Sequence, residues 1–375
     1  GRCNVTNARV TADDFNGPRA TVRNVLAAFD AEAAARWFAA LGVPLKVEPG
    51  GKRFPTTDRA ATVLDALLAR AAALGVAVRP GRRVLDVERA VATATAVAAH
   101  ATAAADDDGG EGPEGAPGDG YPLIVVHARG RLAARRVILA TGGRSLPRTG
   151  SDGGGWAIAA RLGHAVTPTF PALVPLLLDG AFWHAGLSGV SHPAELTTVA
   201  DGRAVDRRAG SLLWTHFGIS GPVVLDASRH WLAARRSAAD VALRCSVLPG
   251  LDARGADGWL VDAARRAGGR PVAAVLADAM PERLARALCR HAAVDAATRT
   301  AELTRDARRA LAGALGGLAL PVVGARGWDY AEVTAGGVPL AEVDPRTMAS
   351  RRAPGLHLVG EMLDVDGRIG GFNFQ

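Results

Sequence analysis

The chain has 375 residues, of which 49% are hydrophobic and 22% are charged. This balance is typical of a globular protein and excludes a disordered, collagen-like or coiled-coil chain, and the length predicts two or three domains. The three cysteines form no CxxC pair and no run of 18 apolar residues occurs. We therefore expect a cytoplasmic protein without a disulfide framework, a cysteine zinc site or a membrane-spanning helix.

The charge balance is basic, with 44 Lys and Arg against 37 Asp and Glu, and all but two of the basic residues are arginines. Such an excess is one feature of nucleic-acid-binding surfaces. The arginines are spread along the chain, however, and aromatic residues make up only 5%. We interpret the excess as a compositional bias and expect no nucleic-acid partner.

The N-terminal region carries helix signals. Leu, Phe and Trp recur at helical spacing over 20–40, which predicts two short helices with Asp30 as a candidate cap. Thr57 and Asp58 are candidate caps for a third helix that runs to about Leu74. Strands follow these helices, and this order is typical of a layered α/β domain.

A low-complexity segment interrupts the predicted strands. Residues 90–120 run from Ala and Thr into a stretch rich in Asp, Gly, Glu and Pro, so we expect them to be disordered. The acidic cluster 106–108 is interpreted as a solvated loop, and no metal site is expected. Alternating patterns predict the neighbouring strands over 76–79, 83–88, 123–127 and 136–139.

The strand over 136–139 runs directly into Ala140, Thr141, Gly142 and Gly143. Open α/β sheets bind ligands at the carboxyl ends of their strands. This small, glycine-containing turn is therefore a candidate ligand site.

The composition and the hydrophobic pattern of the sequence change near residue 167. Short strand-like pieces with frequent Pro and Gly extend to about 247, and helical spacing dominates 252–306. These changes predict an α/β domain with a β-rich insert that itself contains a helical insert. The predicted domains are 1–166 with 345–375, 167–250 with 317–344, and 251–316.

Four separated motifs carry a family resemblance. They are GRCNVTN from Gly1, ATGG from Ala140, THFGISGP from Thr215, and a C-terminal run that reads VTAGGVPLAEVDPRTM from Val333 and then GEMLDVDGRIGGFN from Gly360. In this order they resemble the BaiN-type family of NAD(P)/FAD-dependent oxidoreductases, also called aminoacetone-oxidase-like flavoproteins. The resemblance covers nearly the whole chain. It implies a glutathione-reductase-type, Rossmann-like FAD-binding domain with an inserted β-barrel-like domain and a small helical domain.

The resemblance also implies two missing segments. Family members carry a GxGxxG turn before the first motif, which holds the FAD pyrophosphate at a helix N-terminus, and an aromatic-rich helix after the last one. We therefore expect residues 1–375 alone to bind FAD weakly and the complete protein to bind it well.

The motifs supply the residues implied to hold the FAD. Gly370 and Gly371 permit close backbone approach, and a helix that begins at about Phe372 would direct its N–H groups at the flavin. Glu361 is a candidate acceptor for the ribityl hydroxyls, with Asp364 and Asp366 as alternatives. The full candidate set is Gly1, Arg2, Cys3, Asn4, Thr6, Ala140, Thr141, Gly142, Gly143, Gly360, Glu361, Asp364, Gly370, Gly371, Phe372 and Asn373.

Two further side chains have candidate roles. Cys3 has no neighbouring cysteine, so we interpret it as a packing residue or flavin neighbour rather than a redox group. His216, next to Phe217, is a candidate proton donor to a substrate carbon or carbonyl. The alternative for His216 is a hydrogen-bonded structural role.

The resemblance implies an oxidoreductase in which NADH or NADPH reduces the FAD, and the flavin reduces a small organic acceptor such as a C=C bond next to a carbonyl. Three alternatives stay open: an FAD-dependent amine oxidase, a flavoprotein that acts on RNA, and a flavin carrier without catalysis. The substrate and the oligomeric state are not specified by the sequence.

Overall fold

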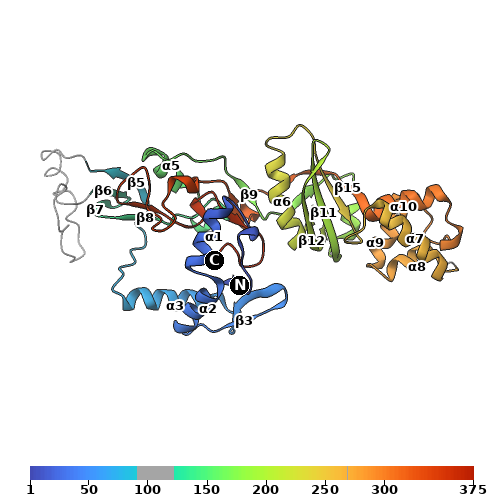
Figure 1. Ribbon diagram of the computed structural model, residues 1–375, viewed down its shortest axis with the longest axis horizontal. Coiled ribbons are helices and arrows are strands. Elements are labelled where there is room, and N and C mark those ends of the chain that lie inside the picture. Colours follow the sequence, from blue (N-terminus) through green and yellow to red (C-terminus); the bar gives the residue numbers. More distant parts are fainter. Residues whose placement is uncertain (91–121, 268) are drawn as a thin grey trace. The chain divides into compact units, whose positions relative to one another are not determined.

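The computed structural model describes residues 1–90, 122–267 and 269–375, so nearly all of the predicted disordered segment and its acidic cluster lie outside the described residues. The chain divides into two compact units (Figure 1). Unit 1 comprises Gly1–Phe170 with Val333–Gln375, and unit 2 comprises Pro171–Glu332. The boundaries of the three predicted domains stay a prediction.

Unit 1 mixes short strands with helices, as expected for an α/β region. Its helices are α1 (Arg19–Ala28), α2 (Ala31–Ala40), α3 (Ala60–Ala73) and α5 (Gly154–Arg161), with 3-10 turns at Ala12–Asp14, Pro49–Gly51, Pro147–Thr149, Leu340–Glu342 and Gly360–Met362. Its strands are β1 (Thr6–Asn7), β2 (Phe15–Asn16), β3 (Leu45–Val47), β4 (Lys52–Pro55), β5 (Val84–Arg89), β6 (Leu123–His127), β7 (Gly130–Ala134), β8 (Val137–Leu139), β17 (Val333–Ala335), β18 (Leu356–Leu358) and β19 (Asp366–Gly367). Strand β9 (Phe170–Ala172) crosses the boundary between the units.

The first helices confirm one predicted cap and correct another. The Asp30 carboxylate accepts a hydrogen bond from the backbone N–H of Ala33 and caps α2. Helix α3, in contrast, has Arg59 at its cap position without a side-chain hydrogen bond. The Asp58 cap was wrong because its backbone is left-handed, with φ +55°, and its carboxylate is paired with Lys46. Thr57 is also no cap.

The strands of unit 1 form small sheets. The strand orders are β1-β4-β3, β5-β6-β7, β19-β2 and β18-β8, and only the last pair is parallel. The predicted strand over 76–79 was wrong: Val76 is 56% and Val78 64% exposed, so no neighbouring strand covers the face on which they alternate. The apolar core of unit 1 consists of separate clusters, one around β8 and β18 and a smaller one around Val5, Val43 and Val63.

Unit 2 contains a longer sheet and a group of helices. Its strands are β10 (Leu176–Leu178), β11 (Ser191–Ala200), β12 (Arg203–Thr215), β13 (Gly218–Ser220), β14 (Val241–Ser246), β15 (Leu318–Leu320) and β16 (Val322–Ala325). Its helices are α6 (Pro222–Ala234), α7 (Ala253–Ala267), α8 (Val272–Ala277), α9 (Glu282–His291) and α10 (Arg305–Gly317), with 3-10 turns at Trp183–Leu187, Thr300–Glu302 and Trp328–Tyr330. Helix α6 lies against the sheet, and α7 to α10 gather beyond its β15 end (Figure 1).

The predicted barrel is not confirmed. The strands are hydrogen-bonded in the order β15-β14-β11-β12-β13-β10-β16, and no ladder joins β15 to β16 among the described residues. These two end strands follow one another in the chain around Pro321, which has no backbone N–H to donate. The sheet is therefore open in its hydrogen bonding.

One continuous apolar core fills unit 2. Buried residues of the sheet, of α6 and of the helical group belong to the same cluster. Trp214 of β12 is its largest fully buried side chain, and its indole N–H donates to Nε2 of His192 at 3.0 Å. The helices of the described residues include none that is long and apolar enough to span a membrane.

Candidate functional site

The parallel pair β8 and β18 positions the first part of the site. Leu139 pairs with Leu358 at the carboxyl ends of the two strands. The segment 140–143 follows β8 and Gly360-Glu361 follow β18, so two motifs more than 200 residues apart meet at one sheet edge. This is the strand-end position at which α/β sheets bind ligands.

A hydrogen-bond network fixes the Glu361 carboxylate at this edge. Its Oε1 accepts from the hydroxyl of Ser145 at 2.8 Å and from the backbone N–H of Thr334 at 2.5 Å. The Thr334 hydroxyl accepts in turn from the backbone N–H of Arg144. A Cβ on Gly143 would lie 2.8 Å from Oε1 of Glu361, so this position requires glycine. In the described residues Oε2 of Glu361 has no hydrogen-bond partner, which leaves it available to a ligand.

The second part of the site joins the first and last motifs. The buried side chain of Asn7 donates to the carbonyl of Gly370 at 3.0 Å. Gly370 and Gly371 have φ +130° and +95°, and a Cβ on Gly371 would lie 2.5 Å from the carbonyl oxygen of Thr6. Left-handed backbone and close approach together explain the two glycines.

Asn4 carries an unpartnered acceptor beside this turn. Its Oδ1 is buried and has no hydrogen-bond partner among the described residues, and a Cβ on Gly371 would lie 2.7 Å from it. Buried polar atoms are rarely left unpaired in native proteins. The free acceptor therefore indicates a ligand N–H or O–H at this position.

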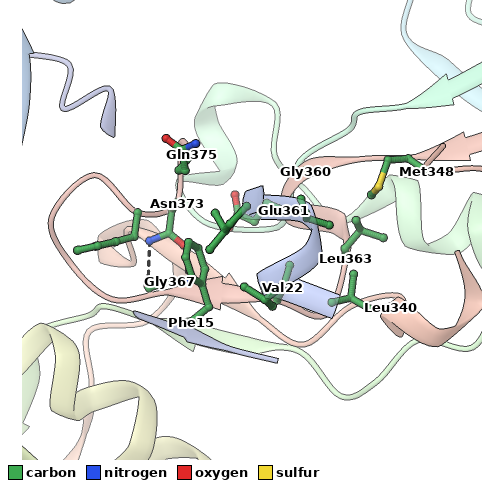
Figure 2. A pocket seen from close by; sticks show the side chains of 14 residues that line it. Phe15, Val22, Leu340, Met348, Gly360, Glu361, Leu363, Gly367, Asn373 and Gln375 are labelled. Carbon is green, nitrogen blue, oxygen red and sulfur yellow. Dashed lines mark hydrogen bonds between the residues drawn. The ribbon is translucent and has the colours of Figure 1, made fainter. Parts of the chain in front are cut away.

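A cavity of about 240 Å³ connects the two parts (Figure 2). Gly360 and Glu361 line it from the first part, and Phe372 and Asn373 line it from the second. The other lining residues are mostly apolar: Phe15, Val22, Val25, Leu26, Leu340, Met348, Leu363, Val365, Gly367 and Gln375. The site is thus an apolar cavity with a carboxylate at its edge.

Residues Phe372 to Gln375 form a turn, and the helix start expected at Phe372 stays a prediction. Phe372 is 1% exposed and packs edge-on against Phe15, and the backbone N–H of Gln375 donates to its carbonyl in a single turn. The Asn373 amide is engaged with both backbone groups of Gly367, at 2.7 and 2.9 Å (Figure 2). The Asn373 side chain therefore holds the turn. Although Asn373 lines the cavity, both of its side-chain polar atoms are hydrogen-bonded to Gly367.

The alternative carboxylates have structural partners. Asp364 accepts from the hydroxyl of Thr167 at 2.9 Å, and buried Asp366 accepts from the side chain of Asn16 at 2.8 Å. Neither lines the cavity. Glu361 is therefore the carboxylate best placed to contact a ligand there.

The first three residues lie outside the cavity lining. Arg2 is ion-paired with Glu48 and Asp58 and stacks on Phe54 at 3.9 Å. Gly1 is exposed. Half-buried Cys3 packs against the cluster of Val5, Val43 and Val63, and burial raises the pKa of its thiol. A thiol held protonated is a poor redox nucleophile, in line with the packing role.

The 140–143 turn also lies beside the cavity rather than in its lining. Ala140 and Thr141 are exposed, and Gly142 has φ +71°. Helix α5 approaches the turn so closely that a Cβ on Gly155 would lie 2.7 Å from Cβ of Thr141.

His216 belongs to unit 2, whereas the cavity belongs to unit 1. It is exposed in the turn between β12 and β13, with its ring 5.1 Å from that of Phe217. No hydrogen bond of its side chain occurs within the described residues, so the structure does not show the hydrogen-bonded structural role.

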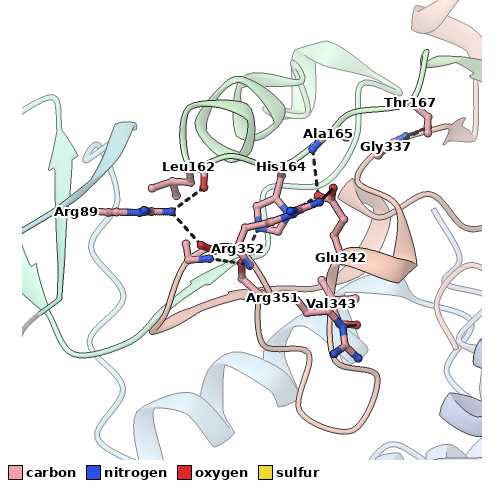
Figure 3. A network of polar contacts seen from close by, with 12 residues as sticks. Arg89, Leu162, His164, Ala165, Thr167, Gly337, Glu342, Val343, Arg351 and Arg352 are labelled. Atoms are coloured by element: carbon pink, nitrogen blue, oxygen red, sulfur yellow. Dashed lines mark hydrogen bonds and ion pairs between the residues drawn. The ribbon is translucent and has the colours of Figure 1, made fainter.

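A buried polar network supports one wall of the cavity (Figure 3). His164, whose side chain is fully buried, contacts Oε2 of Glu342 at 2.8 Å and the hydroxyl of Ser350 at 2.7 Å. These contacts fix the segment that carries the lining residues Leu340 and Met348. Burial alone would raise the pKa of Glu342, but hydrogen bonds from His164, the N–H of Ala165 and Arg352 outweigh it and lower the pKa.

Sequence reasoning missed three site residues: Asn7, Ser145 and Thr334. Each lies in or next to a motif that the sequence analysis identified, so proximity to the motif was the available signal. Their hydrogen bonds join segments that are far apart in the sequence, and motif spacing alone does not reveal such partners. No group of His, Cys, Asp and Glu that could hold a metal ion occurs among the described residues.

Comparison with known proteins places the chain in a family. The family model described as the HI0933-like protein Rossmann domain matches residues 1–107 and 118–375. A 3-dehydro-bile acid delta(4,6)-reductase of Clostridium scindens is 31% identical over 380 residues, which cover all of this chain and 84% of the relative.

Two further relatives match over a shorter region. They are ribosomal RNA dihydrouridine synthases of Escherichia coli and Haemophilus influenzae, 32% and 29% identical over 65% and 64% of this chain. The matches span 58% and 57% of those two relatives. The full-chain match and the family model together show that this chain belongs to the HI0933-like Rossmann family of flavin-dependent oxidoreductases.

Proposed function

We propose that this protein is an FAD-dependent reductase of a carbon–carbon double bond conjugated with a carbonyl group, with NADH or NADPH as electron donor. The observation that carries the proposal is the match along the whole chain to a reductase named for a 3-dehydro-bile acid and its delta(4,6) positions. A 3-oxo group with double bonds at these positions is a conjugated ketone, so the named reaction belongs to the proposed class.

The site residues support a flavin by their chemistry. FAD offers hydroxyl and N–H donors, and the site offers two uncommitted acceptors, Oε2 of Glu361 and Oδ1 of Asn4. The apolar wall suits part of a planar ring system. The cavity is smaller than the roughly 300–1,000 Å³ of sites that enclose a drug-sized ligand, so it would bury only part of the cofactor.

The bound cofactor supplies hydride transfer, and the protein supplies binding and orientation. In this proposal Glu361 accepts ribityl hydroxyls, since its Oε1 is fixed by Ser145 and Thr334 and its Oε2 has no partner among the described residues. The Gly370-Gly371 turn lets the backbone approach the cofactor. Exposed His216 remains the candidate proton donor to the substrate, which is a small organic molecule.

The experiment is an anaerobic spectrum of the full-length protein with bound FAD, recorded before and after NADH or NADPH and then after a steroid enone. The proposal predicts bleaching of the flavin absorbance by the nicotinamide and reoxidation by the enone. A flavin that stays oxidised with both nicotinamides, or that consumes oxygen with small amines instead, would contradict it and favour an amine oxidase.

A second candidate is reduction of uridine in RNA. The two dihydrouridine synthases favour it, because the C5=C6 bond of uracil is also conjugated with a carbonyl. Nucleoside analysis of ribosomal RNA incubated with the reduced protein distinguishes the two: dihydrouridine formation without enone turnover would replace the first candidate by the second.

A further inference from the structure

One arginine of unit 2 is held between two aromatic rings. The guanidinium carbon of Arg326 lies 3.4 Å from the ring centroid of Tyr330 and 4.4 Å from that of Phe217. Within the described part of the chain, Phe217 makes its ring–ring contact with His216 and none with Tyr330. The two rings therefore flank the guanidinium from different sides.

The sheet topology brings these residues together. Strand β10 lies between β13 and β16 in the sheet; Phe217 directly precedes β13 and Arg326 directly follows β16. The backbone N–H of Arg326 extends the ladder by donating to the carbonyl of Pro175 at 3.0 Å. Gly327 then turns the chain with φ +77°, and the N–H of Tyr330 donates back to its carbonyl. This turn returns the Tyr330 ring to the guanidinium.

The charge of Arg326 is not neutralised by an acidic side chain. Among the described residues its guanidinium has no ion pair and no hydrogen bond. The N–H donors of a guanidinium lie in its plane, and those of Arg326 have no partner among the described residues. That planar fork matches two acceptor oxygens of one carboxylate or phosphate.

The rings also fix the side chain before a ligand binds. An arginine on a flexible stem loses rotamer entropy when it binds, and contact with two rings removes part of that cost in advance. Tyr330 is 46% exposed and His216 is exposed, so a ligand can reach this position.

We propose that Arg326, flanked by Phe217 and Tyr330, is a binding site for a carboxylate or phosphate group. The site uses residues of unit 2 only, and its occupation does not require the cofactor or the reduction proposed above.

Binding of matched ligand pairs tests the site without turnover. We would titrate the full-length protein calorimetrically with a steroid carboxylate and the corresponding neutral alcohol, and with uridine 5′-monophosphate and uridine. The expected result is that the anionic member of one pair binds about tenfold more tightly than its neutral partner, the scale of one charge-assisted contact. The steroid pair would assign a carboxylate, and the uridine pair a phosphate.

Three variants make the result specific to Arg326. Arg326→Gln is expected to abolish the anion preference, and Arg326→Lys to lose most of it, because an ammonium keeps the charge but not the planar fork. Arg235→Gln is the matched control, since exposed Arg235 lies beside a single ring, that of Trp231 at 5.8 Å. Thermal unfolding confirms that each variant is folded. Equal binding of both members in both pairs, or an anion preference that survives in Arg326→Gln and Arg326→Lys, would overturn the proposal.

Discussion

The two units differ in how they are stabilised. Unit 2 has one continuous apolar core that its sheet, α6 and its helical group share. Unit 1 has separate apolar clusters, and hydrogen bonds of the buried residues Asn7, Ser145 and Thr334 join motifs that are far apart in its sequence. These hydrogen bonds anchor Glu361 and Gly370 of the candidate flavin site.

The comparison shows how a binding site reduces the apolar contribution to the stability of a fold. Short strands and glycine turns bring distant motifs together, but they bury little apolar surface, so hydrogen bonds must fix the geometry. Each such bond contributes only about 0.5–1.5 kcal/mol net, whereas an unpaired buried partner destabilises by more. Core substitutions in unit 2 should therefore act on stability, whereas substitutions at the candidate site in unit 1 should act on cofactor binding, with or without a loss of stability.

The largest expected effect is in the core of unit 2. Trp214→Ala removes a fully buried indole and its hydrogen bond to His192, and should lower the free energy of unfolding by about 3–5 kcal/mol. Urea unfolding followed by circular dichroism measures the change. Trp37→Ala, at a tryptophan that is 42% exposed, is the control and should cost far less. Equal losses in both variants would contradict the assignment of the core.

A smaller effect is expected from the polar network behind the cavity wall. Glu342→Gln removes the charge that His164, Ala165 and Arg352 stabilise, and should cost about 1.5–3 kcal/mol at neutral pH. Because the folded-state pKa of Glu342 is lowered, its contribution is present above the unfolded value near 4.3 and is lost as pH falls through the folded pKa.

The melting-temperature difference between wild type and Glu342→Gln should therefore shrink as the pH falls below about 4. The exposed Glu302→Gln is the control and should show no such trend. A difference that stays constant across this range would rule out the proposed origin of the stabilisation.

Gly143→Ala tests the strand-end edge of the site. The new methyl group would lie 2.8 Å from Oε1 of Glu361, and such overpacking typically costs about 1–3 kcal/mol. Since it displaces the carboxylate, FAD affinity should fall as well, which fluorescence titration measures. Gly258→Ala in α7 adds a methyl group with nothing within 4 Å and should change neither stability nor FAD binding adversely. Unchanged FAD affinity in Gly143→Ala would indicate that Glu361 does not contact the cofactor.

The smallest effect on stability is expected at Asn4. Asn4→Ala removes an acceptor that has no partner in the described protein, so the free energy of unfolding should hardly change. FAD affinity should nevertheless fall by about tenfold, the value of one hydrogen bond. Asn24→Ala, at an exposed position of α1, should leave both quantities unchanged. A loss of stability without a loss of affinity at Asn4 would indicate a structural side chain.

A buried histidine of unit 2, His230, gives a second test based on the pH dependence of stability. Burial lowers the pKa of His230 in α6 to about 4, while Asp206 opposes and Arg208 and Arg229 assist the shift. The folded state thus binds fewer protons than the unfolded state between about pH 4 and 6.5, and its stability should decrease as pH falls through this range. His230→Gln should flatten this dependence in thermal unfolding; an unchanged slope would contradict the depressed pKa.

Local signals explain what the sequence could predict. Asp30 caps α2 because capping depends on neighbouring residues, and the motifs after β8 and β18 meet because parallel strands end at one edge. Contacts between distant segments could not be predicted from the sequence. Asp58 pairs with Lys46 instead of capping α3, and Val76 and Val78 are exposed rather than covered by a neighbouring strand. The open ladder at Pro321 is likewise a property of strand pairing rather than of strand pattern.

The candidate site was likewise predictable only in part. Glycine positions and Glu361 were predictable as a motif, whereas the anchoring of Glu361 by Ser145 and Thr334 and of Gly370 by Asn7 depends on tertiary contacts. Asp364 and Asp366 resemble Glu361 in the sequence, and only their partners Thr167 and Asn16 separate them from it.

The central claim, that Glu361 holds the cofactor, is tested most directly by equilibrium FAD titration of wild type and Glu361→Gln in the full-length protein. Glutamine keeps an acceptor for Ser145 and Thr334 but replaces the unpartnered oxygen by an amide donor. We predict unchanged thermal stability without FAD and about tenfold weaker FAD binding. Equal FAD affinity of the two proteins would contradict the assignment of Glu361 to the flavin site.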